Sequence, residues 1–515
     1  MVAPTVIFPF SLYRFHGHDL PWRYHCGSMI LPLFPNATAQ SGAVKTILRR
    51  GAGRDPELEP KVRQILTQVR EGGVEAARKL AEKLDGLPKG KPMRLSPREI
   101  VEAARKCPEP VRKAIEHAIE QVTTFHTLQL EESWMSQGKS GQWLGLRVQP
   151  LARVGLYVPG GATAYPSSVI MNAVPAKVAG VKEMIVTTPC PRGLSPALAY
   201  ALDALGLHEV WRIGGAQAIG LLAYGDEKFR RVDKIVGPSN VWAAAAKREV
   251  FGEVAIDNIA GPSEILVMFD ETANPEWVAA DLLSQAEHGS GYEATIAITT
   301  SLEAARRLCA TVVKMVEASP KREILEKVLT RYGAVMACKD WKTALEIANA
   351  LSPEHAQVMV ADPTPLVEGL TNAGAIFVGQ WSSEPLGDYV AGPNHVLPTH
   401  GTARFASPLG VSDFLKRTSI LHYDAQSFAI DAPHAIALAD AEGFHHHAQA
   451  LRIRLDSAEM TEANAPAKKA KTDPKEAKAK AAAKTATKPK AAPKPAPVAA
   501  KPVKAVAKPG SKAKK

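Results

Sequence analysis

The sequence predicts an α/β protein with parallel sheets covered by helices on both faces. From residue 150 onward, short β-branched runs alternate with helical stretches, which is typical of parallel sheets. The chain has 515 residues, of which 46% are hydrophobic, so it can form a large core and two to four domains. No apolar run is long enough for a membrane-spanning helix, and we expect no membrane partner.

In chain order, residues 1–45 come first and form an expected N-terminal extension, apolar but with three histidines and one acidic residue. Low acid content is typical of a plastid transit peptide; the alternative, which we favour, is that the protein starts at Met29. Residues 55–135 then show apolar positions at helical spacing, with Ser-Pro at 96–97 as a typical helix start. A helical segment should therefore precede the sheets.

Eight strands are expected after this segment. They are 183–189, 209–215, 233–238, 264–270, 294–300, 333–338, 357–362 and 375–380. Helical patterns between the strands, such as 239–250, 275–287 and 301–317, supply the crossovers that parallel strands require. These strands are enough for two sheets.

Residues 461–515 carry the positive charge of the chain. They hold 16 lysines and three acidic residues, whereas the whole chain has a formal charge of +11, so the remaining body is nearly neutral. A segment of Lys, Ala and Pro without aromatic residues is expected to be disordered. We interpret it as a solubilising tail whose deletion leaves activity unchanged; the alternative is nonspecific contact with polyanions such as nucleic acid.

The five cysteines are widely spaced, and none forms a C-x-x-C pair. This spacing argues against a disulfide framework and against a cysteine-type zinc site, and it indicates a cytoplasmic location. Cys190, at the end of an expected strand, is the one candidate for a nucleophilic thiolate, and we interpret it as structural.

The segment DLLSQAEHGSG at 281–291 ends an expected helix and places Gln285 and His288 on one helical face. Such a pair, taken alone, is usually an exposed polar surface. Gln is also an uncommon zinc ligand, whereas His, Cys and carboxylates are usual. The pair becomes a candidate metal site only if further donors lie elsewhere in the chain.

Two later clusters contain such donors. Asp388 and His395 lie on an expected loop rich in glycine and proline after a strand, where sites tend to lie in open α/β sheets. Glu442 lies shortly before three consecutive histidines, His445–His447. Imidazole with carboxylate or amide oxygen suits a zinc-type site. Spacing alone leaves open whether the clusters meet at one metal or are separate polar surfaces.

The segment LSPEHAQVM at 351–359 places Glu354 beside His355, just before an expected strand. Within a strand the two side chains would point to opposite faces, but in a turn after Pro353 both could reach one substrate. A carboxylate beside an imidazole suits proton abstraction and water activation near neutral pH. The alternative is an ordinary surface pair.

No expected strand is followed by the G-x-G-x-x-G fingerprint of dinucleotide-binding proteins. Glycine turns occur instead at 154–168, 212–220 and 236–250, and the last two lead into helices. A helix N-terminus behind a glycine turn can bind phosphate, but each turn is also explained as a tight connection between a strand and a helix.

Taken together, these segments resemble the histidinol dehydrogenase family. The motifs GLYVPGG, GGAQAIG, VDKIVGPSN, IAGPSE, SQAEHG, SPEH, GDYVAGPNHVLPT, DFLKRTS and AEGFHHHA follow the order of that family from about 45 to 455. The resemblance implies oxidation of L-histidinol through L-histidinaldehyde to L-histidine, the last step of histidine biosynthesis. It also implies two NAD per reaction, one Zn²⁺ per subunit, and a homodimer.

The resemblance further implies two incomplete Rossmann-like domains, doubly wound and mostly parallel. The implied division is an N-terminal extension over 1–45, a helical segment and the first part of domain 1 over 46–155, an NAD-contacting domain 2 over 156–263, the remainder of domain 1 with the metal and catalytic residues over 264–408, a C-terminal extension in dimer contact over 409–456, and a disordered basic tail over 457–515.

The resemblance assigns site residues by motif. The implied metal ligands are Gln285, His288, Asp388 and His447. His447 is donated across the dimer and is selected over its two neighbours by the family spacing of five after the glutamate. His355 is implied to take the alcohol proton, and Glu354 to activate water. The substrate contacts implied beside these six residues are Ser263, His395 and Glu442, and the implied NAD contacts are Tyr157, Gln217 and Asn240.

Three other readings remain. A covalent aldehyde dehydrogenase would use Cys190 as its nucleophile. Relatives of the same family oxidise other small alcohols, such as sulfonated diols, with the same metal and Glu-His set; His395 and Glu442 favour histidinol. A binding protein that acts through its basic tail would not need the intact catalytic motifs.

Overall fold

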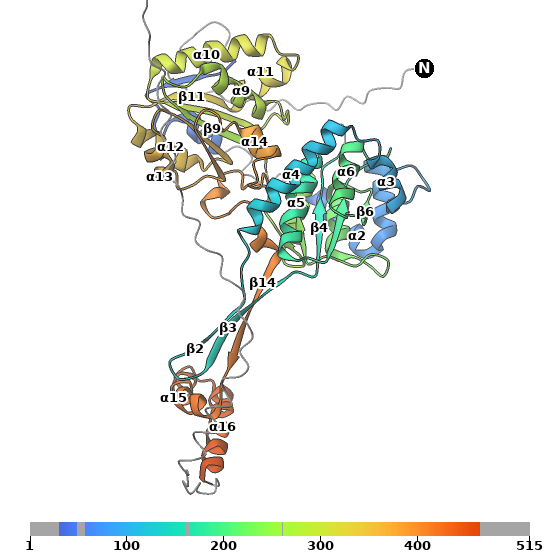
Figure 1. Cartoon of the computed structure of the whole chain (residues 1–515), viewed down its shortest axis with the longest axis vertical. Coiled ribbons are helices and arrows are strands. Elements are labelled where there is room, and N and C mark those ends of the chain that lie inside the picture. The colour runs from blue at the N-terminus through green and yellow to red at the C-terminus, as the bar shows by residue number, and fades with distance from the viewer. Residues whose placement is uncertain (1–29, 49–56, 161–164, 260, 464–515) are drawn as a thin grey trace, which may run out of the picture. The chain divides into compact units, whose positions relative to one another are not determined.

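The computed structural model describes residues 30–48, 57–160, 165–259 and 261–463. The proposed start at Met29 and residues 464–515 of the basic tail lie outside these ranges. Residues 457–463, which were expected to be disordered, end a helix, so this part of the prediction is wrong. The described residues divide into two compact units, the first from residues up to 137 together with 143–421, and the second from 138–142 together with those after 421. The predicted α/β class with parallel sheets is confirmed, and both parallel sheets belong to the first unit (Figure 1).

The larger sheet is parallel throughout. Its strands are β1 (Leu33–Pro35), β9 (Glu264–Phe269), β10 (Ala294–Thr299), β11 (Gly333–Ala337), β12 (His355–Met359) and β13 (Ala375–Val378). Their order is β1-β11-β10-β9-β12-β13. If β1 is set aside and β9 to β13 are numbered one to five along the chain, their order in the sheet is 3-2-1-4-5. This is the strand order of a doubly wound Rossmann sheet without its sixth strand. Its helices are α1 (Gly42–Leu48), α9 (Pro275–Ala286), α10 (Leu302–Glu317), α11 (Arg322–Tyr332), α12 (Trp341–Leu351), α13 (Thr364–Gly369) and α14 (Glu384–Tyr389).

The smaller parallel sheet repeats this topology. Its strands are β4 (Arg153–Tyr157), β5 (Glu183–Thr187), β6 (Val210–Trp211), β7 (Lys234–Val236) and β8 (Ala255–Ile256). Their order, β6-β5-β4-β7-β8, again reads third, second, first, fourth, fifth. Its crossover helices are α5 (Pro166–Ala179), α6 (Pro196–Ala204), α7 (Gly215–Tyr224) and α8 (Val241–Val250).

The expected helical segment packs on this smaller domain. It consists of α2 (Leu58–Leu80), η1 (Ala81–Asp85), α3 (Pro97–Ala104) and α4 (Glu109–Thr127). Helix α2 packs on α7, α3 on α6 and α4 on α5. Ser96 caps α3 with its hydroxyl and Pro97 occupies the first turn, so the predicted Ser-Pro helix start is confirmed.

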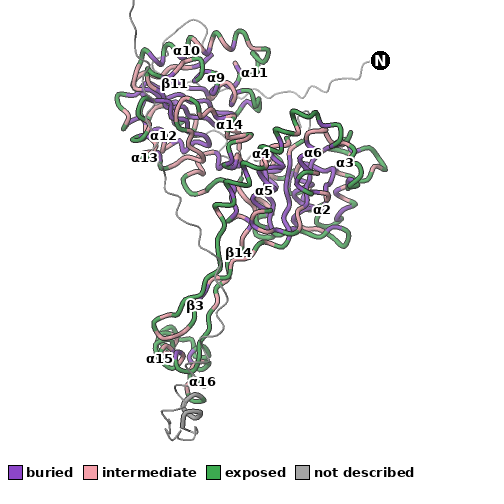
Figure 2. The backbone as a smooth tube through the Cα atoms, in the orientation of Figure 1, coloured by how far each residue is buried: buried purple, intermediate pink, exposed green. Residues whose placement is uncertain are grey.

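A third sheet is short and largely exposed. Strands β2 (Trp134–Gln137), β3 (Trp143–Pro150) and β14 (Leu415–His422) have the order β14-β3-β2, and η2 (Thr402–Arg404) and η3 (Val411–Phe414) precede β14. In the second unit, α15 (Ala425–Ala441) packs against α16 (His445–Ala463). Figure 2 shows buried backbone in the central strands of the parallel sheets and mainly exposed backbone in β14, α15 and α16.

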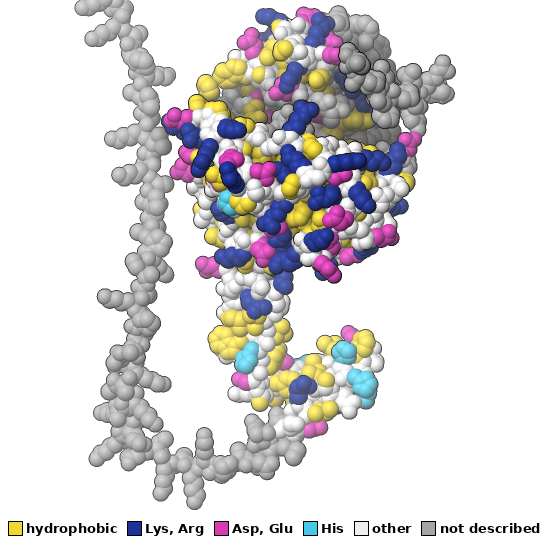
Figure 3. Space-filling view, turned by 90° about the vertical axis from the view of Figure 1, so that its right-hand side faces the viewer, with side chains coloured by type: hydrophobic (Ala, Val, Ile, Leu, Met, Phe, Trp, Pro, Cys, Tyr) yellow, Lys and Arg dark blue, Asp and Glu magenta, His cyan; other side chains and the backbone are white. Residues whose placement is uncertain are grey.

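The burial follows from the sequence. Every residue of β4, β9 and β10 is buried, because helices cover both faces of a parallel sheet. The sequences of such strands are accordingly rich in apolar residues. On the face shown in Figure 3, Lys and Arg are interspersed with Asp and Glu, as expected for a nearly neutral body. None of the helices in the described ranges is long and apolar enough to cross a membrane.

Some expected elements differ from the structure. The strand expected over 209–215 is limited to Val210–Trp211, because the chain then turns and the Arg212 amide donates to the carbonyl of Met93. Strand β4 lies where a glycine turn was expected. Strand β1 pairs with β11, so this part of the expected 1–45 extension belongs to the sheet. The domain limits stay predictions.

Candidate active site

The predicted Glu-His pair lies at the amino end of the larger sheet. His355 is the first residue of β12, and Glu264 is the first residue of the neighbouring strand β9. The backbone amide of Glu264 donates to Glu354 Oε2 at 2.8 Å, and the amide of Glu354 donates to Glu264 Oε2 at 3.2 Å. The first bond fixes the Glu354 carboxylate against the start of β9, and the second fixes the Glu264 carboxylate against the backbone of Glu354.

The expectation that His355 lies in a turn before its strand is wrong, because β12 begins two residues earlier than the apolar run indicated. The two side chains nevertheless share one site: Glu354 Oε2 lies 3.7 Å from His355 Nδ1. Only His355 has strand conformation, so the alternation of faces along a strand does not separate the pair.

The hydrogen bonding of His355 determines its tautomer. Its Nδ1 lies 2.9 Å from the backbone oxygen of Glu264. Since a carbonyl oxygen only accepts, Nδ1 carries the proton and Nε2 presents its lone pair. Burial lowers the pKa of His355 from its ordinary value. The ring is therefore neutral near pH 7 and can accept a proton at Nε2.

The pKa of Glu354 shifts in the opposite direction to that of His355. Burial raises the pKa of Glu354 well above its ordinary value, and the nearby carboxylates of Glu264, Asp388 and Glu384 raise it further. A carboxylate with a raised pKa is a stronger base than one in water, which suits it to accept a proton from a water molecule.

Helix α14 brings two more carboxylates to this pair. Glu384 begins the helix and Asp388 follows one turn later. Donor atoms of His355, Glu384 and Asp388 all lie within 4.8 Å of one another, and His355 Nε2 is 3.7 Å from Glu384 Oε1. Burial and the Asp388 charge raise the pKa of Glu384 to about 8. This set can hold a proton or contribute to cation binding.

The loop predicted to carry Asp388 and His395 is a loop only at His395, since Asp388 lies in α14. His395 Nδ1 lies 2.9 Å from the backbone oxygen of Asp388, so this imidazole also keeps Nε2 free. The site does not lie at the carboxyl ends of the strands, which is the usual ligand position in open α/β sheets. The Glu-His pair lies at the amino ends of β9 and β12, close to Glu384 and Asp388 of α14.

Gln285 and His288 lie at the carboxyl end of α9. Gln285 is buried, and its Oε1 has no hydrogen-bond partner within the described part of the chain. Its Nε2 is 3.4 Å from Nδ1 of the exposed His288, which is 3.2 Å from the Gln285 backbone oxygen. An unpartnered buried acceptor at the negative end of a helix dipole is a favourable position for a cation.

Three predicted substrate or metal contacts, Ser263, Glu442 and His447, form no side-chain hydrogen bond or ion pair with the Glu-His pair or the α9 and α14 residues, among the residues that the structure describes. Ser263 directly precedes β9, and its backbone oxygen accepts from Ala294. Glu442 and His447 belong to the second unit, where Glu442 follows α15 and both side chains are exposed. The His447 ring lies 5.0 Å from the Phe444 ring. The joining of these two residues to the site stays a prediction.

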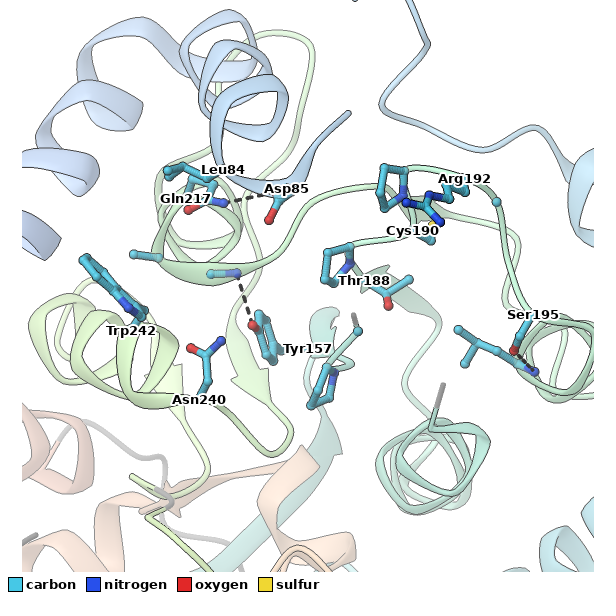
Figure 4. A pocket seen from close by; sticks show the side chains of 18 of the residues that line it. Leu84, Asp85, Tyr157, Thr188, Cys190, Arg192, Ser195, Gln217, Asn240 and Trp242 are labelled. Atoms are coloured by element: carbon cyan, nitrogen blue, oxygen red, sulfur yellow. Dashed lines mark hydrogen bonds between the residues drawn. The ribbon is translucent and has the colours of Figure 1, made fainter. Parts of the chain in front are cut away.

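A cavity of about 920 Å³ lies at the carboxyl ends of the smaller sheet (Figure 4). Tyr157, Gln217 and Asn240, the three predicted NAD contacts, all line it. Tyr157 ends β4, whereas Asn240 follows β7 and caps α8 through a 3.0 Å bond from the Ala243 amide. Strands β4 and β7 flank the point where the strand order reverses, the usual ligand position in doubly wound sheets.

Hydrogen bonds inside this cavity fix its polar side chains. The Tyr157 hydroxyl accepts from the Gly215 amide at 3.1 Å, and burial raises the pKa of Tyr157 to about 12. Gln217 Nε2 donates to Asp85 Oδ2 at 3.0 Å, and the Gly214 amide donates to the same oxygen at 3.1 Å. Figure 4 shows Asp85 beside Gln217 on one wall.

Cys190 lines the same cavity, but burial raises its thiol pKa to about 11. The thiol is therefore protonated at neutral pH, which disfavours the reading as a thiolate nucleophile.

Sequence reasoning missed several of these residues. Glu384 was detectable, since it stands four residues before Asp388, the spacing of one helical turn. Glu264 ends the motif IAGPSE, but its role was not apparent because its partner Glu354 lies in another part of the chain. Asp85 carried no local signal, since it contacts Gln217 from a distant segment.

Comparison with known proteins gives one consistent family. Residues 48–455 match the family model described as histidinol dehydrogenase. The chain is 48% identical over 409 residues to histidinol dehydrogenase of Aquifex aeolicus, covering 79% of this chain and 95% of that protein. It is 44% identical over 417 residues to that of Bacillus subtilis, covering 80% and 97%. The crystal structure of histidinol dehydrogenase from Elizabethkingia anophelis matches with a TM-score of 0.79 at 30% identity, covering 84% of this chain and 99% of that one.

Proposed function

This chain belongs to the histidinol dehydrogenase family, as its motifs predicted, and from that premise we propose that it oxidises L-histidinol through L-histidinaldehyde to L-histidine with NAD. The observation that carries the proposal is the buried Glu354–His355 pair, in which burial raises the pKa of Glu354 and lowers the pKa of His355. Amide, imidazole and carboxylate donors occur in the same domain, at the end of α9 and on α14. These are the groups that two successive oxidations at one carbon require.

His355 acts as the base in both oxidations. Its neutral Nε2 takes the hydroxyl proton of the alcohol as hydride leaves the carbinol carbon, and later takes the proton of the aldehyde hydrate in the same way. The bond from Nδ1 to the Glu264 carbonyl holds the ring and stabilises the positive charge that it gains.

Glu354 acts between these steps. Its carboxylate removes a proton from water, and the oxygen attacks the aldehyde carbon to give the hydrate. The raised pKa of Glu354 makes it basic enough for this task near neutral pH. Because the pair is buried, the aldehyde is shielded from bulk solvent between the two oxidations.

The donor set fits a zinc ion. We assign Gln285, His288 and Asp388 as its ligands, with His447 of the partner subunit as the fourth. The unpartnered Gln285 Oε1 supports the assignment, and amide, imidazole and carboxylate are all donors that a borderline metal accepts. When bound, the ion would orient the substrate nitrogens and thereby direct the carbinol carbon.

NAD fits the cavity of the smaller sheet. Tyr157, Gln217 and Asn240 would contact it, and the cavity lies where doubly wound sheets bind nucleotides. When bound, NAD accepts the hydride in each oxidation. We assign Ser263, His395 and Glu442 as further contacts of L-histidinol. His395 supports this role because its Nε2 is free to contact a polar substrate.

A homodimer would supply His447. The largely exposed β2–β3 hairpin supports it, since Trp134 is 54% exposed, Met135 47% and Trp143 46%, and such apolar surface is usually covered by a partner. We also propose the cytoplasm as its location, in keeping with the thiols of Cys107, Cys190 and Cys338, which form no disulfide within the described residues.

The test is NADH formation from L-histidinol by the purified protein, before and after chelator treatment and with zinc restored. We expect two NADH per histidinol, loss on chelation and recovery with zinc. If histidinol yields no NADH while zinc is bound, the substrate assignment is wrong, and other small alcohols become the substrates to test.

A further inference from the structure

A buried carboxylate outside the proposed ligand set joins three elements of the larger domain. Asp281 on α9 is 6% exposed. Its Oδ1 accepts from the hydroxyl of Ser383 at 2.6 Å, and its Oδ2 accepts from Nε2 of Gln357 at 2.7 Å. We call this arrangement the Asp281 junction.

Each arm of the junction leads to a residue of the proposed site. Asp281 lies one turn before Gln285 on α9. Ser383 precedes α14, the helix that carries Asp388. Gln357 lies two positions after His355 on β12, on the same face of the strand. One carboxylate therefore connects the supports of a proposed metal ligand on α9, a second ligand on α14 and the catalytic histidine.

Helix α14 depends on such contacts for its position. It has six residues, fewer than an isolated helix needs for stability in water, so tertiary contacts must hold it. It packs beside α9. The Ser284 hydroxyl on α9 lies 3.3 Å from Glu384 Oε2, and Gln357 Nε2 also donates to the Ser382 carbonyl at 3.2 Å. These two contacts lie next to the Asp281 junction, and they too hold α14 and the residues before it against α9 and β12.

We propose that Asp281 is a positioning residue for the metal site: its bond from Ser383 holds the start of α14 against α9, and its bond from Gln357 holds α9 against β12, so that Asp388 and Gln285 bind one ion. The inference rests on the ligand set proposed above. Removing the junction would leave the ligands in place but loosely held. Loss of a partner that orients metal ligands typically lowers metal affinity by about 10- to 100-fold.

Two substitutions separate the hydrogen bonds from the charge. Asp281→Ala removes both bonds. Asp281→Asn can keep both, since its carbonyl oxygen accepts from Gln357 while its amide donates to the Ser383 hydroxyl. Asn274→Ala is the matched control: Asn274 caps the opposite end of α9 through a 2.9 Å bond from the Glu276 amide.

The measurements are zinc affinity by competition with a chromophoric chelator, the visible absorption of the cobalt-loaded protein, and thermal unfolding of the chelator-treated protein. We expect Asp281→Ala to lose about 10- to 100-fold in zinc affinity and to alter the cobalt spectrum. Asp281→Asn should retain most of the affinity, and Asn274→Ala should match the wild type in both metal readouts.

The outcomes separate this inference from the proposed function. If the wild type binds no zinc, the proposed metal site fails. If the wild type binds zinc and Asp281→Ala binds it equally well with an unchanged cobalt spectrum, only the positioning role fails. An Asp281→Asn variant as weak as Asp281→Ala would overturn the hydrogen-bond explanation. Should Asp281→Ala not fold, Ser383→Ala removes one arm, and unchanged zinc affinity in that variant would equally reject the proposal.

Discussion

The Nδ1 atom of His355 lies 2.9 Å from the backbone oxygen of Glu264, and this contact decides which nitrogen of the ring is free for chemistry. It joins the first residues of two neighbouring strands, so the sheet backbone itself orients the imidazole. The proton resides on Nδ1, and Nε2, which keeps its lone pair, lies 3.7 Å from Glu384 Oε1.

Replacing His355 with Asn should abolish the base without disturbing its support, because the Asn amide can still donate to the Glu264 carbonyl. We expect turnover of L-histidinol to fall by about 10²- to 10⁴-fold with zinc content and NAD binding unchanged. Steady-state kinetics and metal analysis check this, with the exposed His117→Asn on α4 as the control. Turnover near that of the control would remove His355 from the acid–base role.

Glu384 should make the stability of the chelator-treated protein depend on pH. Its pKa of about 8 in the folded protein exceeds the ordinary value of 4.5, so the native state binds the proton more tightly than the unfolded state does. This contribution is fully present below pH 4.5 and is lost as the pH rises through about 8. Glu384→Gln should therefore flatten the fall in unfolding free energy over this window, measured by urea denaturation. The exposed Glu368→Gln should not, and equal slopes in the two variants would contradict the assignment.

Asp85 should control NAD binding through Gln217. Asp85→Ala removes the acceptor that holds the Gln217 amide and the Gly214 backbone. We expect the KM for NAD to rise roughly tenfold, the size of one hydrogen bond to a charged group, with a smaller change in kcat. The exposed Asp362→Ala in the other domain is the control. An unchanged KM would mean that Gln217 does not need this support.

The Lys247–Asp257 ion pair should be essential for stability. The two side chains are 0% and 2% exposed and lie 2.6 Å apart, and Lys247 also donates to the Gly237 carbonyl at 2.7 Å. Lys247→Met leaves an unpaired buried carboxylate and should lower the unfolding free energy by about 3–5 kcal/mol. Adding Asp257→Asn removes that charge and should recover part of the loss. A double variant no more stable than Lys247→Met would show that the charge is not the cause.

Cys190→Ala should retain turnover, because burial keeps the thiol protonated with a pKa of about 11. The measurement is kcat with L-histidinol, together with the effect of iodoacetamide on wild type and variant. A loss of several orders of magnitude in kcat would instead favour the covalent reading based on this cysteine.

The chain by itself determined the α/β class. Parallel strands buried on both faces are mostly apolar, and the runs ILVMF in β9 and IAI in β10 are recognisable in the sequence for this reason. Two-residue strands such as β6 carry too little pattern to be delimited. The three-stranded sheet was missed because its strands are exposed, and its pairing joins β3 to the distant β14.

The sequence predicted those residues of the site that stand in recognisable motifs, but not the contacts between them. Gln285, Asp388, Glu354 and His355 stand in recognisable segments, and their side-chain types indicate the chemistry. Tertiary structure decided the rest. Glu264 orients His355 from the next strand, and Asp281 meets Ser383 about a hundred positions later. Tautomer, pKa and ligand spacing depend on neighbours in space and on exclusion of water, and neither is encoded in local sequence.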